Sequence, residues 1–468
     1  MGFPFKDLRE FLRFLEEKND LVRVKVEVDP TWEINGITKK LLDEGGPAVL
    51  FEKVKGSNIP LLCNLYGAER RFLWALGMEG TDVRRFNEEW RKRTQKLIEP
   101  VMVKSGPCKE NIIRGEQVDI TKFPIPIWHK QDGGRYIGTL SVCITKDPDT
   151  GWRNAGIYRM MIFSRNETGW GAPPYTHGGL HFKKYEERGE PMPMAVVTGY
   201  DPVIGIVGAT RTPPYVDEFA LAGALRGEPV EMVKCETIDL EVPATAEFVF
   251  EGEVLPNVRR EDGPFGEYTG YYGGKAQVPV FRIKAITHRN NPIYMGAREG
   301  WEPSESFYLN GLTSQAEAYK TLKSLVPGIV DFKANVCYEA IVSIKKMYRG
   351  HAQQVMDAIW GCTYSKYKHV IVVPHYVDVH DYRQVHWALS TLVKADRDVY
   401  IVRRRSGQWL DPAQPRSEKM WQTCMGIDAT GPTYEYEAEG EKFPDTVDDP
   451  DIKAKVEAQW EKYGLKKK

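Results

Sequence analysis

The chain has 468 residues, enough to bury a large core, and this length predicts two or three domains. Its 64 lysines and arginines balance 65 acidic residues, so a net charge of −1 gives no indication of binding to nucleic acid or to an anionic membrane. No apolar run reaches the ~18 residues of a membrane span, and the N-terminus lacks a signal-peptide core. Seven scattered cysteines without a Cys-x-x-Cys pair favour a reducing compartment, and we expect a cytoplasmic location.

The first part of the chain has mixed α and β patterns. Apolar residues recur at helical spacing in residues 6–17, 35–42 and 69–76. Alternating valines in residues 21–28 predict a strand. We therefore expect an N-terminal α/β part over residues 1–115.

The central part, residues 116–310, is expected to be mostly β. A proline-rich segment at 123–128 marks its beginning, because proline is unfavourable in paired strands and in helix interiors. Strand-like runs follow at 137–145, 156–164, 192–199, 231–240, 246–254 and 278–287. Many short strands between glycine-rich turns predict a barrel or a sandwich.

In the last third of the chain the spacing of the apolar residues changes. After a helix predicted at 312–326, strand patterns at 340–344, 370–373 and 399–402 alternate with helix patterns at 352–360 and 382–393. This alternation predicts a separate α/β domain with a largely parallel sheet over residues 331–468, joined by a linker helix at 311–330. The tail at 449–463 predicts a polar amphipathic helix with too few apolar residues to fold alone, so we expect it to pack on another element or a neighbouring subunit.

The most informative motif is the acidic loop Glu261-Asp-Gly-Pro-Phe-Gly-Glu267, which Tyr-Thr-Gly-Tyr-Tyr-Gly-Gly follows. Its glycines permit positive φ and its proline restricts the backbone, so one rigid loop can present both Asp262 and Glu267. Taken alone, the same residues could form an ordinary acidic turn between strands at 247–254 and 278–286.

Three further segments accompany this loop: Trp152-Arg-Asn-Ala-Gly-Ile-Tyr-Arg159, Thr176-His-Gly-Gly-Leu-His181 and the helix-opening Asp217-Glu. Together the four segments resemble the UbiD family of prenylated-flavin-dependent decarboxylases. The resemblance extends along nearly the whole chain, through Asp239-Leu-Glu-Val-Pro-Ala, Phe250-Glu-Gly and Gly426-Ile-Asp-Ala-Thr.

The resemblance implies an α+β fold with an N-terminal part, a split β-barrel that binds the flavin, a linker helix and a C-terminal α/β domain used for oligomerisation into a dimer or hexamer. It implies reversible, non-oxidative decarboxylation of an aromatic or α,β-unsaturated acid by prenylated FMN, which a prenyltransferase partner supplies. Two alternatives remain: the same chemistry on an aryl acyl-CoA thioester, with Arg403–Arg405 near a CoA phosphate, or a split-barrel protein that reduces ordinary FMN. A reductase would not need the paired acids and the arginine.

Arg159, Asp262 and Glu267 match the catalytic arginine and the two acids of the family. The planar guanidinium suits a carboxylate, and a partly desolvated acid can keep the proton that Glu267 would donate. The first acid is commonly Glu in the family, whereas this chain has Glu261 and Asp262 side by side. We favour Asp262 because it keeps the five-residue spacing to Glu267.

The resemblance also assigns a metal and cofactor site. Asn154, His181 and Glu218 match the positions that hold Mn²⁺ against the cofactor phosphate, with His177 as an alternative to His181. Backbone oxygens near Trp152 and at Val207, Gly208 and Thr210 would hold K⁺. Further cofactor contacts would come from Gly156, Ile157, Tyr158, Arg159 and Leu180. Cys424 occupies the position of the family's phosphate-binding lysine, and Lys419 is the nearest lysine that could replace it.

Overall fold

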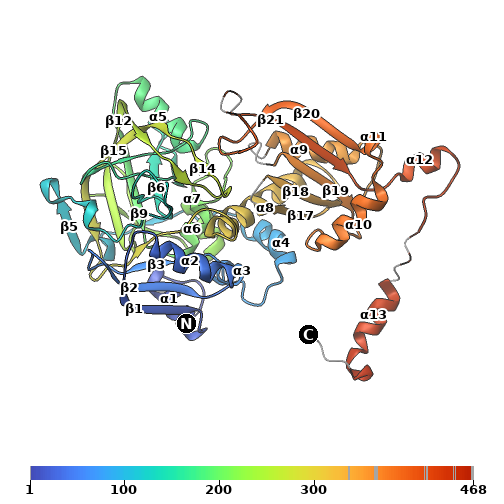
Figure 1. Cartoon of the computed structure of the whole chain (residues 1–468), viewed down its shortest axis with the longest axis horizontal. Coiled ribbons are helices and arrows are strands. Elements are labelled where there is room, and N and C mark those ends of the chain that lie inside the picture. The colour runs from blue at the N-terminus through green and yellow to red at the C-terminus, as the bar shows by residue number, and fades with distance from the viewer. Residues whose placement is uncertain are drawn as a thin grey trace.

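The computed structural model describes residues 2–335, 338–362, 367–415, 417, 420–445, 447 and 450–464. Figure 1 shows two bodies side by side, with the long helix α8 (Glu305–Leu325) between them and the helix α13 (Pro450–Ala458) standing away from both. The predicted mixed fold of α and β elements is confirmed. None of the described helices is long and apolar enough to cross a membrane.

The N-terminal part is built on a four-stranded sheet in the order β1-β2-β3-β16. Its elements are α1 (Leu8–Glu17), β1 (Leu21–Val28), α2 (Glu33–Asp43), β2 (Ala48–Val54), β3 (Leu61–Cys63), α3 (Glu69–Ala75) and α4 (Val83–Arg93). The apolar positions expected on one face of α1 are all buried. The fourth strand, β16 (Tyr294–Met295), comes from much later in the chain, so this sheet cannot be completed by the N-terminal residues alone.

The central part is organised around a seven-stranded sheet in the order β5-β15-β12-β9-β6-β7, with β8 also pairing with β15. Its strands are β5 (Asn111–Arg114), β6 (Val142–Lys146), β7 (Arg153–Ile157), β8 (Glu167–Gly169), β9 (Met192–Thr198), β12 (Phe248–Asp262) and β15 (Ala276–His288). In the described residues this sheet stays open, as a split barrel does. The shorter strands are β4 (Val101–Met102), β10 (Glu231–Lys234), β11 (Glu241–Pro243), β13 (Phe265–Gly266) and β14 (Tyr272–Gly273).

The central part contains more helix than its sequence pattern indicated. Three helices interrupt it: α5 (His177–Glu187), α6 (Pro202–Gly208) and α7 (Glu218–Arg226). Helix α5 begins at His177, where the Thr176 side chain caps it by accepting from Gly179 N. The adjacent glycines hide this helix in the sequence, because glycine is a poor helix former. Gly179 is required by packing: a Cβ there would lie 2.3 Å from the Pro173 carbonyl oxygen.

The C-terminal body contains a five-stranded sheet in the order β17-β18-β19-β21-β20. Its elements are β17 (Ile329–Asn335), β18 (Glu339–Ile344), α9 (His351–Cys362), β19 (His369–Pro374), α10 (Tyr382–Leu392), α11 (Ala395–Asp398), β20 (Val399–Ser406), β21 (Trp421–Asp428) and α12 (Thr433–Ala438). Only the three central strands are parallel, and both edge strands pair antiparallel. The prediction of a largely parallel sheet was therefore right for the centre and wrong for the edges.

Helix α8 belongs to both bodies. Its first half, with Leu309, Leu312 and Ala316, packs into a core that the N-terminal and central parts share. Its second half, with Tyr319 and Leu322, packs into the core of the C-terminal body. The expected linker helix therefore begins several residues earlier than predicted and joins two hydrophobic cores instead of crossing solvent.

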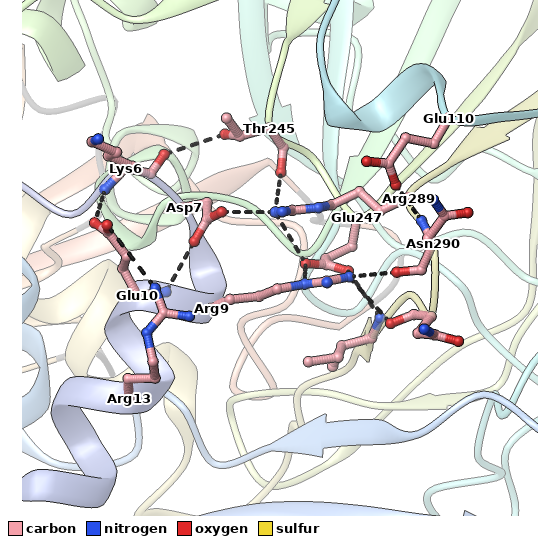
Figure 2. Close-up of polar contacts among 12 residues, drawn as sticks. Lys6, Asp7, Arg9, Glu10, Arg13, Glu110, Thr245, Glu247, Arg289 and Asn290 are labelled. Atoms are coloured by element: carbon pink, nitrogen blue, oxygen red, sulfur yellow. Dashed lines mark hydrogen bonds and ion pairs between the residues drawn. The ribbon is translucent and has the colours of Figure 1, made fainter.

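A buried ion-pair network fastens α1 to the central sheet (Figure 2). Arg9 donates from Nε and Nη2 to the two carboxylate oxygens of Glu247, each at 2.8 Å, and Glu247 is fully buried. Arg289 pairs with Asp7 at 2.8 Å and lies 3.5 Å from Glu247. Because Glu247 precedes β12 and Arg289 follows β15, the network holds α1 against the two long strands that carry the acidic loop.

We expect Arg9→Met to lower the free energy of unfolding by about 3 kcal/mol, because it leaves the buried Glu247 carboxylate with fewer charged partners. Arg289 remains near Glu247, which keeps the loss at the low end for a buried pair. Arg85→Met is the matched control: Arg85 is an exposed arginine on α4 of the N-terminal part, so its loss should cost less than about 0.5 kcal/mol. Urea unfolding of both variants tests this, and equal losses would contradict it.

Candidate active site

Arg159 joins the two predicted acids in one buried cluster. Its Nη2 lies 2.8 Å from Asp262 Oδ1, and its Nη1 pairs with Glu267 Oε1. The arginine follows β7, Asp262 is the last residue of β12, and Glu267 follows β13. Two segments that are distant in sequence thus meet beside the central sheet, and both carboxyl side chains are largely removed from water.

The acidic loop connects β12 to β15 as a hairpin, and a second, smaller hairpin forms at its tip. Strands β12 and β15 pair antiparallel up to Asp262 and Ala276, as the simpler reading of the loop predicts. Gly263 has φ of +97°, a conformation that glycine adopts without strain. Beyond it, β13 and β14 form a small second hairpin, in which Glu267 N donates to Tyr271 O at 3.0 Å. This second hairpin turns Glu267 towards Arg159.

Glu261 and Asp262 occupy very different environments. Glu261 is exposed and pairs with Lys275 at 2.7 Å, whereas Asp262 is fully buried beside Arg159. Because successive residues of a strand point to opposite faces, only one of the two acids can face Arg159. The position favoured from the five-residue spacing is the one that lies there.

Burial and charge act in opposite directions on this cluster. Burial raises the pKa of Asp262 and of Glu267, Arg159 pulls both back down, and each carboxyl remains above its ordinary value. Burial lowers the pKa of the Arg159 guanidinium, but the two carboxylates outweigh this and the net shift is upward. The arginine is therefore charged, and the acids hold protons more readily than exposed carboxyls do.

Glycines permit the close packing around the three charges. A Cβ at Gly273 would lie 3.1 Å from both Arg159 Nη1 and Glu267 Oε1. One at Gly171 would lie 3.0 Å from Arg159 Cγ, and one at Gly169 would lie 3.2 Å from Asp262 Oδ2. The glycine-rich composition of these turns therefore reflects space needed beside the charged side chains.

Sequence reasoning missed a loop that supports the hairpin from outside. Asp132 accepts from Gly266 N at 2.9 Å and from His129 N at 2.8 Å, and His129 Nε2 lies 2.8 Å from the Glu299 carbonyl oxygen. The sequence feature that could have indicated this contact is Gly133, which follows the proline-rich segment at 123–128. A Cβ at Gly133 would lie 2.2 Å from the Gly263 carbonyl oxygen, so the two loops need glycine at their contact.

The three predicted metal ligands gather around β7. Thr145 of β6 is paired with Asn154 in the sheet, and its Oγ1 lies 3.0 Å from His181 Nδ1. The backbone N–H of Ala155, next to Asn154, donates to Glu218 Oε2 at 2.9 Å. Thr212 donates to the other oxygen of Glu218 at 2.7 Å. The supporting threonines were not foreseen from the sequence.

The donor set fits a divalent cation. His181 Nε2 is buried and has no hydrogen-bond partner among the described residues, so its lone pair is available to a cation. Burial lowers the pKa of His181 to about 4 and raises the pKa of Glu218 to about 8. A neutral imidazole, an amide and a carboxyl form the mixed N/O set that such cations accept, and the Thr145 contact is the kind that orients a ligating histidine. In the described part of the chain, no group of three or more His, Cys, Asp or Glu side chains could hold a metal. The proposed set contains only two such residues, His181 and Glu218, and takes its third ligand from the amide of Asn154.

Trp152 covers both candidate histidines. Its ring centroid lies 4.6 Å from that of His177 and 5.0 Å from that of His181, and its Nε1 donates to Val216 O at 3.1 Å. The histidines are one turn apart on α5, but His181 is 1% exposed while His177 is only partly buried. The difference in burial favours His181 as the ligand.

The remaining predicted site residues are distributed around β7 and the neighbouring helices. Gly156 and Ile157 lie in β7, Tyr158 is buried just after it, and Leu180 is exposed on α5. Val207 and Gly208 end α6, and the Val207 carbonyl accepts from Thr210 N at 3.0 Å.

Strand β21 carries the position at which the family commonly has its phosphate-binding lysine. Cys424 is buried in β21, and burial raises the pKa of its thiol to about 11. Such a thiol is uncharged and offers no positive charge to a phosphate. Lys419 lies outside the described residues.

Known proteins resemble the chain along almost its whole length. Three family models match it: the N-terminal, Rift-related and C-terminal domains of 3-octaprenyl-4-hydroxybenzoate carboxy-lyase, over residues 12–90, 100–300 and 307–429. An uncharacterised protein of Archaeoglobus fulgidus is 38% identical, covering 97% of this chain and 98% of its own.

Two solved structures share the fold. The UbiD-class enzyme HmfF from Pelotomaculum thermopropionicum, in an evolved dimeric form in complex with prFMN, is 34% identical with a TM-score of 0.82, covering 96% of this chain and 98% of its own. Vanillic acid decarboxylase from Sedimentibacter hydroxybenzoicus, in its closed form, is 33% identical with a TM-score of 0.91, covering 98% and 99%. The chain therefore belongs to the UbiD family of prenylated-FMN-dependent (de)carboxylases.

Proposed function

We propose that the protein is a reversible, non-oxidative decarboxylase of an aromatic or α,β-unsaturated carboxylic acid that uses prenylated FMN. The observation that carries this proposal is the buried Arg159 cluster, in which one guanidinium pairs with both Asp262 and Glu267. Family membership and the prFMN complex of HmfF support the cofactor.

Each side chain of the cluster has a distinct role in the proposal. Prenylated FMN, when bound, would supply the electron sink that makes loss of CO₂ from an sp² carbon accessible. Glu267 donates its proton to the carbon that loses CO₂ and regains a proton from solvent, so the net reaction exchanges CO₂ for H⁺. Arg159 orients the acid substrate, and Asp262 holds the guanidinium in place. In carboxylation, Glu267 accepts the proton instead.

The second cluster is assigned to cofactor binding. Asn154, His181 and Glu218 would hold a divalent ion such as Mn²⁺ at the cofactor phosphate, and K⁺ would lie on backbone oxygens near Trp152, Val207, Gly208 and Thr210. The buried His181 Nε2, which has no hydrogen-bond partner among the described residues, supports this assignment. Gly156, Ile157, Tyr158 and Leu180 remain candidate flavin contacts, and Lys419 a candidate phosphate contact.

The alternatives make different demands on the site. A thioester substrate would use the same acids, but Arg405 pairs with Asp357 at 3.2 Å and Arg404 lies 5.8 Å from the Trp421 ring centroid, so these arginines already have contacts. An FMN reductase has no use for two buried acids. The mass of the extracted cofactor separates reductase from decarboxylase, and a panel of aromatic acids, vanillic acid included, with their CoA thioesters separates the substrates.

The C-terminal helix α13 is the basis for a proposal about how the protein assembles. Helix α13 stands away from both bodies (Figure 1), and its sequence has few apolar residues. A helix of this kind gains stability by docking on another surface. We assign it to contacts within a homo-oligomer, a dimer or a hexamer.

The first test removes the acid and the arginine. Glu267→Gln and Arg159→Ala should each lower turnover by about 10² or more, because proton transfer and substrate orientation are lost. Glu261→Gln is the matched control, since it changes an exposed acid of the same loop and should keep activity within about twofold. Kinetics on cofactor-loaded enzymes measure this. Near wild-type rates in Glu267→Gln would remove Glu267 from the reaction.

The second test compares the two histidines. His181→Ala should purify with much less flavin and Mn²⁺ than wild type, because it deletes the buried imidazole, whereas His177→Ala should retain more of both. Elemental analysis and flavin absorbance give the two occupancies. The opposite order would move the ligand to His177, and full occupancy in both variants would exclude histidine from the site.

The third test uses pH. Burial raises the pKa of Glu267, and only its protonated form can donate, so the proton is available below this pKa and is lost as pH rises through it. We expect kcat/KM for decarboxylation to fall on the alkaline side, with a midpoint above the ordinary value for glutamate. A pH profile of the loaded enzyme measures this midpoint. A rate that rises with pH would contradict the role of Glu267 as the acid.

A further inference from the structure

The tip of the hairpin that carries Glu267 touches the C-terminal body. Tyr268 Oη lies 3.2 Å from Tyr338 Oη, and the two rings pack edge to face with centroids 6.4 Å apart. In Figure 1 the neighbouring strand β14 lies on the flank of the central sheet that faces the C-terminal body. The residue directly after the proposed proton donor is therefore in contact with the other body.

Tyr338 is rigidly held on its side of the contact. It is 3% exposed and has φ of +72°, a left-handed conformation that costs a non-glycine residue about 1 kcal/mol or more. Its carbonyl accepts from Lys368 N at 2.9 Å and from His369 N at 3.0 Å. The Lys368 ammonium lies 5.4 Å from the centroid of its ring and pairs with the buried Asp411 at 2.8 Å. These contacts fix the hydroxyl relative to the C-terminal sheet.

Tyr268 is coupled to Glu267 through the backbone. Residues 267–270 form a tight turn, in which Gly270 N donates to Glu267 O at 2.9 Å and Gly270 has φ of +83°. Because Glu267 and Tyr268 share a peptide plane at the start of this turn, a movement of the tyrosine changes the direction of the Glu267 side chain. Holding Tyr268 thus restricts where the carboxyl can reach.

We propose that Tyr338 is a positioning residue, which acts through Tyr268 to align the Glu267 hairpin when the C-terminal body is seated against the central sheet. The inference rests on the proposed role of Glu267 as proton donor. A carboxyl that delivers a proton to a substrate needs its backbone held in place, because misplacement by about 1 Å can lower a rate severely. The contact makes proton delivery depend on the C-terminal body, although the acids themselves belong to the central part.

The test compares Tyr338→Phe, Tyr268→Phe and the double variant in the full-length enzyme. The matched control is Tyr319→Phe on α8, away from the hairpin. It removes a tyrosine hydroxyl that lies 3.3 Å from the Glu88 carboxylate. Hydrogen exchange of the 263–275 segment reports on the hairpin whether or not an acid substrate is known. We expect faster exchange in both single variants, no further increase in the double variant, and none in the control.

Kinetics on cofactor-loaded enzyme, with the panel acid that wild type turns over fastest, give the second readout. Each single variant should lower kcat about fivefold with KM unchanged, and the double variant should lose no more than either single one. Unchanged exchange in the segment, or a loss of kcat without faster exchange, would overturn the proposal. If wild type decarboxylates none of the acids, the proposed function fails, while the exchange measurement still decides whether Tyr338 restrains the hairpin.

Discussion

Arg159 shares one guanidinium between two carboxyl groups that are removed from water, so the protein must hold three charged or titratable groups together at fixed distances. Burying such groups is costly unless each retains a close partner of opposite charge. Much of the central architecture meets this requirement: two long strands end beside the arginine, glycines open space around it, and the Asp132 loop supports the hairpin. Weakening any of these supports should disturb the acids first.

Strand β7 links this cluster to the second one. Asn154 lies within the strand and Arg159 just after its end, so a five-residue separation connects the proposed metal site to the proposed proton donor and substrate site. Residues of the same strand move together, so a cofactor held at the proposed metal site would stay in register with the acids. Helix α7 brings Glu218 to Ala155 of this strand, and α5 brings His181 to Thr145 of the neighbouring strand β6.

The two bodies contribute unequally to the chemistry. The clusters described above lie in the central part, while the C-terminal body approaches them through α8 and through the contact of Tyr268 with Tyr338. Because α8 packs into both hydrophobic cores, relative movement of the bodies must be accommodated around this helix. The ion pairs of Arg9 and Glu247 hold the N-terminal helix α1 against the central sheet.

Local sequence patterns determined a large part of the secondary structure and the family assignment of this protein. The amphipathic face of α1, the hairpin of β12 and β15, the alternation in the C-terminal body and the family itself could all be read from spacing and motifs, because each depends on residues close in sequence. Other features depend on contacts between distant segments. Helix α5 contains two glycines that only packing against Pro173 explains, and the antiparallel edges of the C-terminal sheet follow from strand pairing that no periodicity encodes. The different burial of Asp262 and Glu261, the different burial of His181 and His177, and the approach of Tyr338 to the acid hairpin were decided only by the tertiary structure, since burial and long-range proximity are properties of the folded chain.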